Sequence, residues 1–164
     1  MAEFSPAEIA AAEEVARAAA GELVGTLLPE LAGAMERGGA VEAIGVCADR
    51  AQELTAGVEA EYSGVRLRRT SLRVRNPVNR PDAYERAWME SLETPAAEAR
   101  VVGDELRYLQ PLVMGELCLR CHGPAEGINP GVRAVLAERY PEDEAVGFGV
   151  GELRGVVSVR VGLE

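Results

Sequence analysis

Two cysteines and a histidine stand close together in the stretch Cys118-Leu119-Arg120-Cys121-His122. A Cys-x-x-Cys pair followed at once by histidine is typical of the motif that attaches a c-type haem covalently. The two thiols add across the two vinyl groups of the porphyrin, and the adjacent imidazole offers a nitrogen to the iron. His122 is the single histidine of the chain. The motif therefore predicts one haem c per chain, with Cys118 and Cys121 as its anchors and His122 as an axial ligand.

Two other chemistries use cysteine pairs of this spacing. A dithiol redox centre usually accompanies a βαβ pattern and has no fixed histidine after it. A Cys₃His zinc site would need Cys47 together with the three residues of the motif. Adjacent residues such as Cys121 and His122 rarely both reach one metal ion, so zinc is disfavoured on steric grounds. The haem interpretation is preferred, and the other two stay open.

The composition is that of an ordinary globular protein, with 164 residues, 48% hydrophobic and 27% charged. This length suits a single domain over residues 1–164. No apolar run approaches the roughly 18 residues of a membrane-spanning helix, so we expect no transmembrane segment. The net charge is −10, which argues against nucleic acid as a partner because phosphate binding needs a basic surface.

The first residues, Met-Ala-Glu-Phe-Ser-Pro, lack the basic region and the apolar region of a signal peptide. Haem is normally attached to such motifs outside the cytoplasm. We therefore expect a periplasmic or otherwise exported protein whose signal sequence has been removed from this chain.

The N-terminal third predicts helices. The stretch Ser5-Pro6-Ala7-Glu8 is a helix start with a capping box. Pro29 predicts a kink or a division into two helices, and Gly38-Gly39 ends an N-terminal helical segment over residues 1–38. A second helix is expected over 41–57. Its inward face carries Ile44, Cys47, Ala51 and Leu54, and the ordinary role of such a cysteine is that of a small buried hydrophobe.

The rest of the chain predicts mainly strands. A strand is expected over 62–74, with a change of phase near Leu72 that a bulge or a strand end would explain. A hairpin is expected over 99–114, in which Pro111 suggests that the second strand is an edge strand or ends early. A closing hairpin pairs 146–150 with 156–161.

Short helices are expected through Tyr84 and Trp88 and after Asn129-Pro130. These elements make an α+β domain of about five mostly antiparallel strands with helices on one side. Residues 41–164 form its core.

Basic residues concentrate where a haem would need counter-charges for its propionates. Five arginines fall between Arg66 and Arg75, and a turn-rich loop follows. Arg75 and Asn76 are the first candidates for the propionates and Arg69 is the reserve, because arginine matches a carboxylate in two-pronged geometry. The alternative is that these arginines only line a solvated strand face. Tyr84 and Trp88 could wall the haem pocket, but core packing suits them better.

Several segments spread over most of the chain form a distinctive set: Val46-Cys47-Ala48, Arg68-Arg69-Thr70-Ser71-Leu72, Arg75-Asn76-Pro77, Gly115 to Gly123, Tyr140-Pro141 and Gly151 to Gly155. Through these segments the chain resembles the PAS-like single-haem c-type cytochrome domain family, long catalogued as a domain of unknown function. The resemblance implies a PAS-like antiparallel sheet, a haem bound axially by histidine and cysteine, and a role in redox or gas sensing. By position, it makes His122 the proximal and Cys47 the distal ligand.

The residues themselves agree with a cysteine on the far face of the haem. With one histidine, the iron cannot have two histidine ligands. Lysine is absent, and Met114 lies too close to Cys118 in the chain to reach the opposite face. Cys47 is the favoured distal ligand, and another methionine, water or an open position are the alternatives.

A thiolate ligand has consequences for function. It favours ferric iron, so a His122/Cys47 haem should have a low reduction potential. On reduction the bond to Cys47 should weaken, which would open a site for a diatomic gas. We therefore expect a redox or gas sensor that signals to an unknown protein partner, with a low-potential electron-transfer cytochrome as the alternative. An enzyme such as a peroxidase is not expected, because the chain has no second histidine for acid–base work.

Overall fold

The computed structural model describes residues 3–116 and 118–164, apart from the side chains of residues 47 and 48. Its centre is a four-stranded antiparallel sheet with the strand order β1-β4-β3-β2. The strands are β1 (Val65–Thr70), β2 (Glu98–Val102), β3 (Glu105–Val113) and β4 (Leu153–Gly162). The chain is thus an α+β protein with an antiparallel sheet and N-terminal helices, as predicted, with four strands in the described residues in place of about five.

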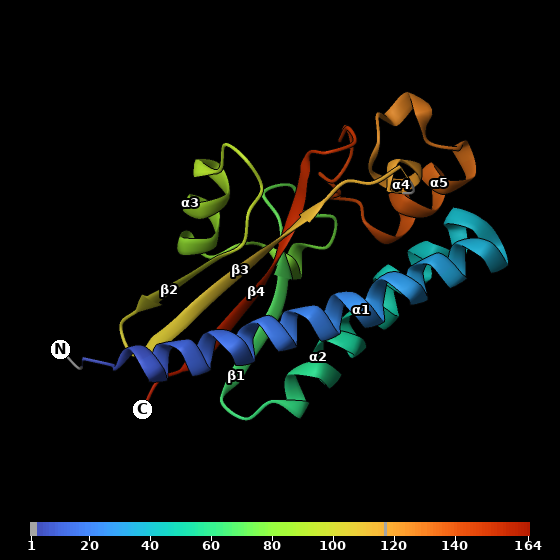
Figure 1. Ribbon diagram of the computed structural model, residues 1–164. Coiled ribbons are helices and arrows are strands. Elements are labelled where there is room, and N and C mark those ends of the chain that lie inside the picture. Colours follow the sequence, from blue (N-terminus) through green and yellow to red (C-terminus); the bar gives the residue numbers. More distant parts are fainter. Residues whose placement is uncertain (1–2, 117) are drawn as a thin grey trace.

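A long helix, α1 (Pro6–Gly45), runs along one face of the sheet (Figure 1). It begins with the predicted capping box, in which the Glu8 amide donates to Ser5 Oγ and the Ser5 amide donates to the Glu8 carboxylate. The backbone stays helical through Pro29, so the proline does not divide the helix. The break lies at Gly39, whose φ of 71° and ψ of −159° are not helical. Glycine adopts this conformation without steric cost.

After Gly39 the chain returns toward the sheet (Figure 1). The end of α1 leads into one π-helical turn, η1 (Val46–Arg50), and then into α2 (Ala51–Glu61). The described helices include none that is both long and apolar enough to span a bilayer.

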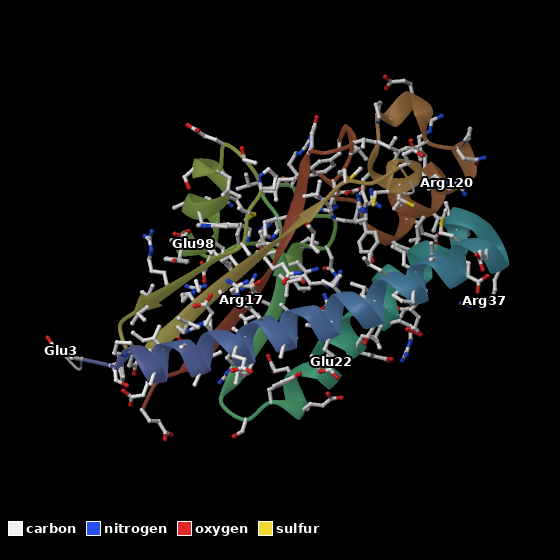
Figure 2. The ribbon with its side chains drawn as sticks, in the orientation of Figure 1. Glu3, Arg17, Glu22, Arg37, Glu98 and Arg120 are labelled. Atoms are coloured by element: carbon white, nitrogen blue, oxygen red, sulfur yellow. The ribbon has the colours of Figure 1, made fainter. Side chains whose placement is uncertain are left out.

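The main core lies between α1 and the sheet. Val157, Val159 and Val161 point to the same face of β4, as their alternation predicts, and they pack against α1. The facing side of α1 is built of small residues, which allow the helix to approach the sheet closely. Its fully buried members are Ala16, Ala19, Ala20 and Leu23. At the border of this layer, Arg17 of α1 donates a hydrogen bond of 3.3 Å to the Tyr108 hydroxyl of β3 (Figure 2).

The other face of the sheet also carries a helix, which corrects the expectation that all helices lie on one side. Helix α3 (Ala83–Ser91) places Trp88 and Met89 against Leu109 of β3 and Val156 of β4. Tyr84 packs at the edge of the same cluster. Both aromatic residues thus have the core role that the sequence favoured for them.

Two strand predictions are confirmed, and one needs correction. The β2–β3 hairpin forms with Gly103 at its turn, where φ is 65°. Strand β1 ends at Thr70, which explains the change of phase near Leu72. Pro111 does not make β3 an edge strand, since β3 pairs with both β2 and β4. The proline is tolerated because pairing with β2 stops at Leu109, beyond which β3 has a neighbour on one side.

Residues 146–150 do not form the fifth strand that the sequence predicted. The Gly147 and Phe148 amides bond to the carbonyls of Gly123 and His122, at the end of the cysteine motif, and not to β4. The remaining elements are η2 (Pro77–Asn79), α4 (Leu119–His122), η3 (Ala125–Gly127) and α5 (Pro130–Arg139).

Gly155 allows β4 to lie close to the end of β1. A Cβ at this position would lie 2.5 Å from the Thr70 carbonyl oxygen and 3.3 Å from Ser71 Cβ. Backbone cannot move away as a flexible side chain would. We expect Gly155→Ala to lower the free energy of unfolding by about 1–3 kcal/mol, as overpacking does. Urea denaturation of the two proteins measures this difference.

Gly57→Ala is the matched control for this prediction. Gly57 lies on the exposed side of α2, and a Cβ there meets no atom within 4 Å. The same glycine-to-alanine change in a helix should stabilise by roughly 0.5–1 kcal/mol. Equal effects of the two substitutions would show that the close contact at Gly155 has no energetic weight.

Candidate cofactor site

A cavity of about 380 Å³ opens between α1 and the end of the sheet at which β3 finishes. Its size lies within the roughly 300–1,000 Å³ of typical ligand sites. One wall is apolar and comes from α1, and the other walls come from the ends of β3 and β4 and from the loop after β1. The residues of the α1 wall are Leu23, Val24, Leu27, Leu28, Leu31, Met35, Ala43 and Ile44. The cavity is therefore suited to a mostly apolar group with some polar atoms at its edge.

The cysteine motif closes one end of this cavity. Cys118, Cys121 and His122 all border it. They sit on the single turn α4, in which the His122 amide donates to the Cys118 carbonyl at 2.9 Å. Gly123 ends the turn, and a Cβ there would lie 2.6 Å from the Leu119 carbonyl oxygen. The short turn thus brings all three predicted residues to one site, as the motif requires.

The imidazole of His122 has a fixed orientation. Its Nδ1 lies 2.8 Å from the carbonyl oxygen of Ala145. A carbonyl only accepts hydrogen bonds, so Nδ1 carries the hydrogen and Nε2 keeps its lone pair for a metal. A ligating histidine commonly has such a partner on its second nitrogen. The Phe148 ring stands edge-on to the imidazole, with 6.3 Å between the ring centroids.

The surroundings of His122 keep the ring neutral. Loss of hydration lowers the pKa of His122 well below its usual value of 6.5, and the positive charges of Arg154 and Arg75 lower it further. The bond to the Ala145 carbonyl opposes this shift without reversing it. A neutral imidazole is the form that binds a metal ion.

Residues 146–150, predicted as a fifth strand, instead hold the cysteine motif in place through backbone hydrogen bonds. The Phe148 amide donates to the His122 carbonyl at 2.9 Å, and the Gly147 amide donates to the Gly123 carbonyl at 2.8 Å. Gly147 has a φ of 82°, so its backbone takes a turn that glycine tolerates well. The valine and glycine pattern of this segment indicates a strand, but its amides find their acceptors on a distant part of the chain.

The three residues proposed for the propionates all border the cavity. Arg75 is buried, and its guanidinium forms an ion pair of 3.1 Å with Asp143 and bonds to the carbonyls of Cys121 and Ala145. Asn76 accepts a hydrogen bond from the Val78 amide through Oδ1 and so caps η2. Arg69 lies at the end of β1. Their contact with propionates stays a prediction.

Sequence reasoning missed two side chains at this site. Arg154 of β4 borders the cavity, and its guanidinium also lies 5.4 Å from the centre of the Phe148 ring. Tyr140, at the end of α5, borders the cavity as well. Arg154 lies in the segment from Gly151 to Gly155, and it could have been predicted as a site residue because arginine suits a propionate. Nothing in the sequence indicates the role of the Ala145 carbonyl.

The predicted distal ligand, Cys47, is untested, because its side chain lies outside the described residues. Its backbone lies in η1, the π-helical turn that follows α1. Such turns are frequent at functional sites. The preceding turn borders the cavity through Ala43 and Ile44.

The fold and the site together define a class of protein. It is an α+β protein in which a Cys-x-x-Cys-His motif closes an apolar, arginine-edged cavity beneath a long N-terminal helix. The chain matches the Tll0287-like family over residues 5–162 and belongs to that family.

Among solved structures, the chain is similar to the crystal structure of the cyanobacterial heme-protein Tll0287. The two share 22% sequence identity and a TM-score of 0.67, and the match covers 97% of each chain. This likeness confirms the fold. No curated protein matches the chain.

Proposed function

We propose that this chain is a cytochrome that binds one haem c, attached through Cys118 and Cys121 and ligated by His122. The observation that carries the proposal is the common position of these three side chains at one cavity, with Nε2 of His122 left unprotonated by the bond from Nδ1 to Ala145. The similar cyanobacterial protein is a heme-protein by description, which supports the same assignment.

The residues around the cavity fit this group. The leucines of α1 offer an apolar wall to a porphyrin face, and Arg69, Arg75 and Arg154 place positive charge at its border for two carboxylates. Bound haem supplies a one-electron redox centre. The protein's part is to hold it, to fix the orientation of His122 and to limit the access of water.

We further propose Cys47 as the second axial ligand and a redox or diatomic-gas sensor as the function. The chemistry of the donor supports this, since a thiolate is held more firmly by the more positive ferric iron. Reduction of bound haem would weaken the hold of the iron on Cys47, and the released thiolate would take up a proton from solvent water. A change in the position of η1 would then pass to α1 and α2, to which it is joined.

This function also implies a place and a partner. We propose the periplasm or another exported compartment as its location, because haem is normally attached to such motifs outside the cytoplasm. Since a sensor must pass its signal on, a redox or signalling protein would be its partner.

The distal ligand is tested by Cys47→Ala. We expect wild-type ferric protein to show the absorption and electron paramagnetic resonance spectra of a low-spin haem thiolate, and the variant to lose them. Val46→Ala is the matched control, because it truncates a buried side chain in the same turn and keeps the thiol. An unchanged spectrum in Cys47→Ala would exclude Cys47 as the ligand.

Carbon monoxide separates sensing from electron transfer. A sensor that releases Cys47 on reduction should bind carbon monoxide in the ferrous state. If the ferrous protein stays six-coordinate and refuses carbon monoxide at every accessible pH, gas sensing fails and an electron-transfer cytochrome becomes the better assignment.

A further inference from the structure

Arg75 belongs to a closed network behind His122, on the side away from Nε2. Asp143 accepts from Arg75 Nε through Oδ2 at 3.1 Å and from the Ala145 amide through Oδ1 at 2.8 Å. Arg75 Nη2 donates to the Ala145 carbonyl at 3.0 Å and also to the Cys121 carbonyl. Residue 145 is thus held at both its amide and its carbonyl.

The Ala145 carbonyl serves two donors at once. It accepts from His122 Nδ1 at 2.8 Å and from Arg75 Nη2 at 3.0 Å. A carbonyl oxygen has two lone pairs, so these two bonds use its full capacity. The pair Arg75–Asp143 is almost completely buried, with side chains 9% and 12% exposed, and is therefore little screened by solvent.

The shared carbonyl affects the electron density of the imidazole. A partner that accepts strongly from Nδ1–H raises the basicity of a ligating histidine. Here the guanidinium withdraws density from the same carbonyl oxygen, so the bond from Nδ1–H is weaker than it would be to an unshared acceptor. The positive charge of Arg75 also disfavours a more positive iron nearby. Both effects favour the ferrous state and so raise the reduction potential.

We propose that Arg75, held by Asp143, is a positioning residue for His122, which acts through the shared Ala145 carbonyl to fix the ring and to limit its strength as a donor. The proposal rests on the assignment of His122 as a haem ligand. It gives Arg75 a role that differs from the binding of a propionate, because Nε and Nη2 donate to acceptors of the protein itself.

The test compares reduction potentials and ferric electron paramagnetic resonance spectra of the holoprotein. In Arg75→Met the carbonyl serves His122 alone and a charge is lost. We expect the ratio of reduced to oxidised protein at a fixed applied potential to fall about tenfold, which is about 59 mV for a one-electron couple. The g values should shift toward those of a stronger imidazole donor.

Arg73→Met is the matched control. Arg73 donates to the neighbouring carbonyl, that of Val146, at 3.0 Å, whereas His122 bonds to Ala145. This variant removes one positive charge and one bond to the adjacent carbonyl, together with the contact of 3.7 Å between the Arg73 guanidinium and the Phe148 ring. Its g values should equal those of wild type, and its potential should fall less because the Arg73 side chain is 42% exposed.

Two further variants show whether the changes seen in Arg75→Met come from misfolding or from the loss of charge alone. Asp143→Asn leaves Arg75 without its counter-ion and should raise the potential. Arg75→Lys keeps the charge and loses the planar fork, so it should change the g values as Arg75→Met does with a smaller change in potential.

The outcomes separate the two proposals. If Arg75→Met leaves the g values unchanged and lowers the potential no more than Arg73→Met does, the positioning role is wrong while the haem assignment stands. If the wild-type protein shows no haem absorption, the proposed function fails and this inference fails with it.

Discussion

Replacing Cys118 and Cys121 together by alanine is expected to abolish covalent retention of haem. The wild-type chain should keep its haem on a denaturing gel, visible by haem staining, and the double variant should keep none. The reason is that both thioether bonds need these thiols, whereas a bond from His122 to iron alone does not survive denaturation. Pyridine haemochrome spectra of the two proteins give the same comparison quantitatively.

Cys47→Ala is the control for this result. It removes the third cysteine of the chain but neither thioether, so its haem should stay on the gel even if its axial ligation changes. Retention of stainable haem by the Cys118/Cys121 double variant would contradict the attachment. A wild-type protein without haem that contains zinc or a reversible dithiol would favour one of the alternatives that the sequence left open.

Arg107→Met is expected to destabilise the protein by about 1–3 kcal/mol, because it removes one of the two arginines beside the buried Glu85 carboxylate and leaves the more exposed Arg68 as the remaining cation. Glu85 of α3 is fully buried, and Arg107 of β3 lies 3.7 Å from its Oε2 and 2.8 Å from Asp82. The Arg107 side chain is itself only 8% exposed. The ion pair lies between α3 and the sheet, so losing it affects the packing of the whole helix. Urea denaturation measures the resulting change in the free energy of unfolding.

Arg160→Met gives the matched control, since Arg160 lies directly opposite Arg107 on β4. Its ion pair with Glu105 is more exposed, with 45% of the Arg160 side chain accessible. Exposed pairs contribute about 0–1 kcal/mol. Combining Arg107→Met with Glu85→Met should recover part of the loss, because replacing both buried charges by apolar groups is often neutral. If Arg107→Met and Arg160→Met lower the free energy of unfolding equally, burial does not determine how much an ion pair contributes here.

Much of the fold could be predicted because its signals are local. The capping box at Ser5 and the turn at Gly103 depend on residues a few positions apart. The valine alternation in β4 correctly indicated its buried face. The errors arose where distant contacts decide the outcome. Residues 146–150 alternate like a strand, but the Gly147 and Phe148 amides bond to the carbonyls of Gly123 and His122 at the end of α4.

The sequence alone indicated the three motif side chains of the candidate site, whereas Arg154 and Tyr140 were found only in the structure. The spacing of Cys118, Cys121 and His122 places three reactive groups on one turn, and no tertiary contact is needed for that. The tertiary structure decided how His122 is used. The Ala145 carbonyl that orients the ring lies 23 positions away, and every residue type has such a carbonyl, so no pattern of side chains can indicate it. Arg75 reaches that carbonyl, and its counter-ion Asp143, only after the loop following β1 and the loop following α5 have packed together.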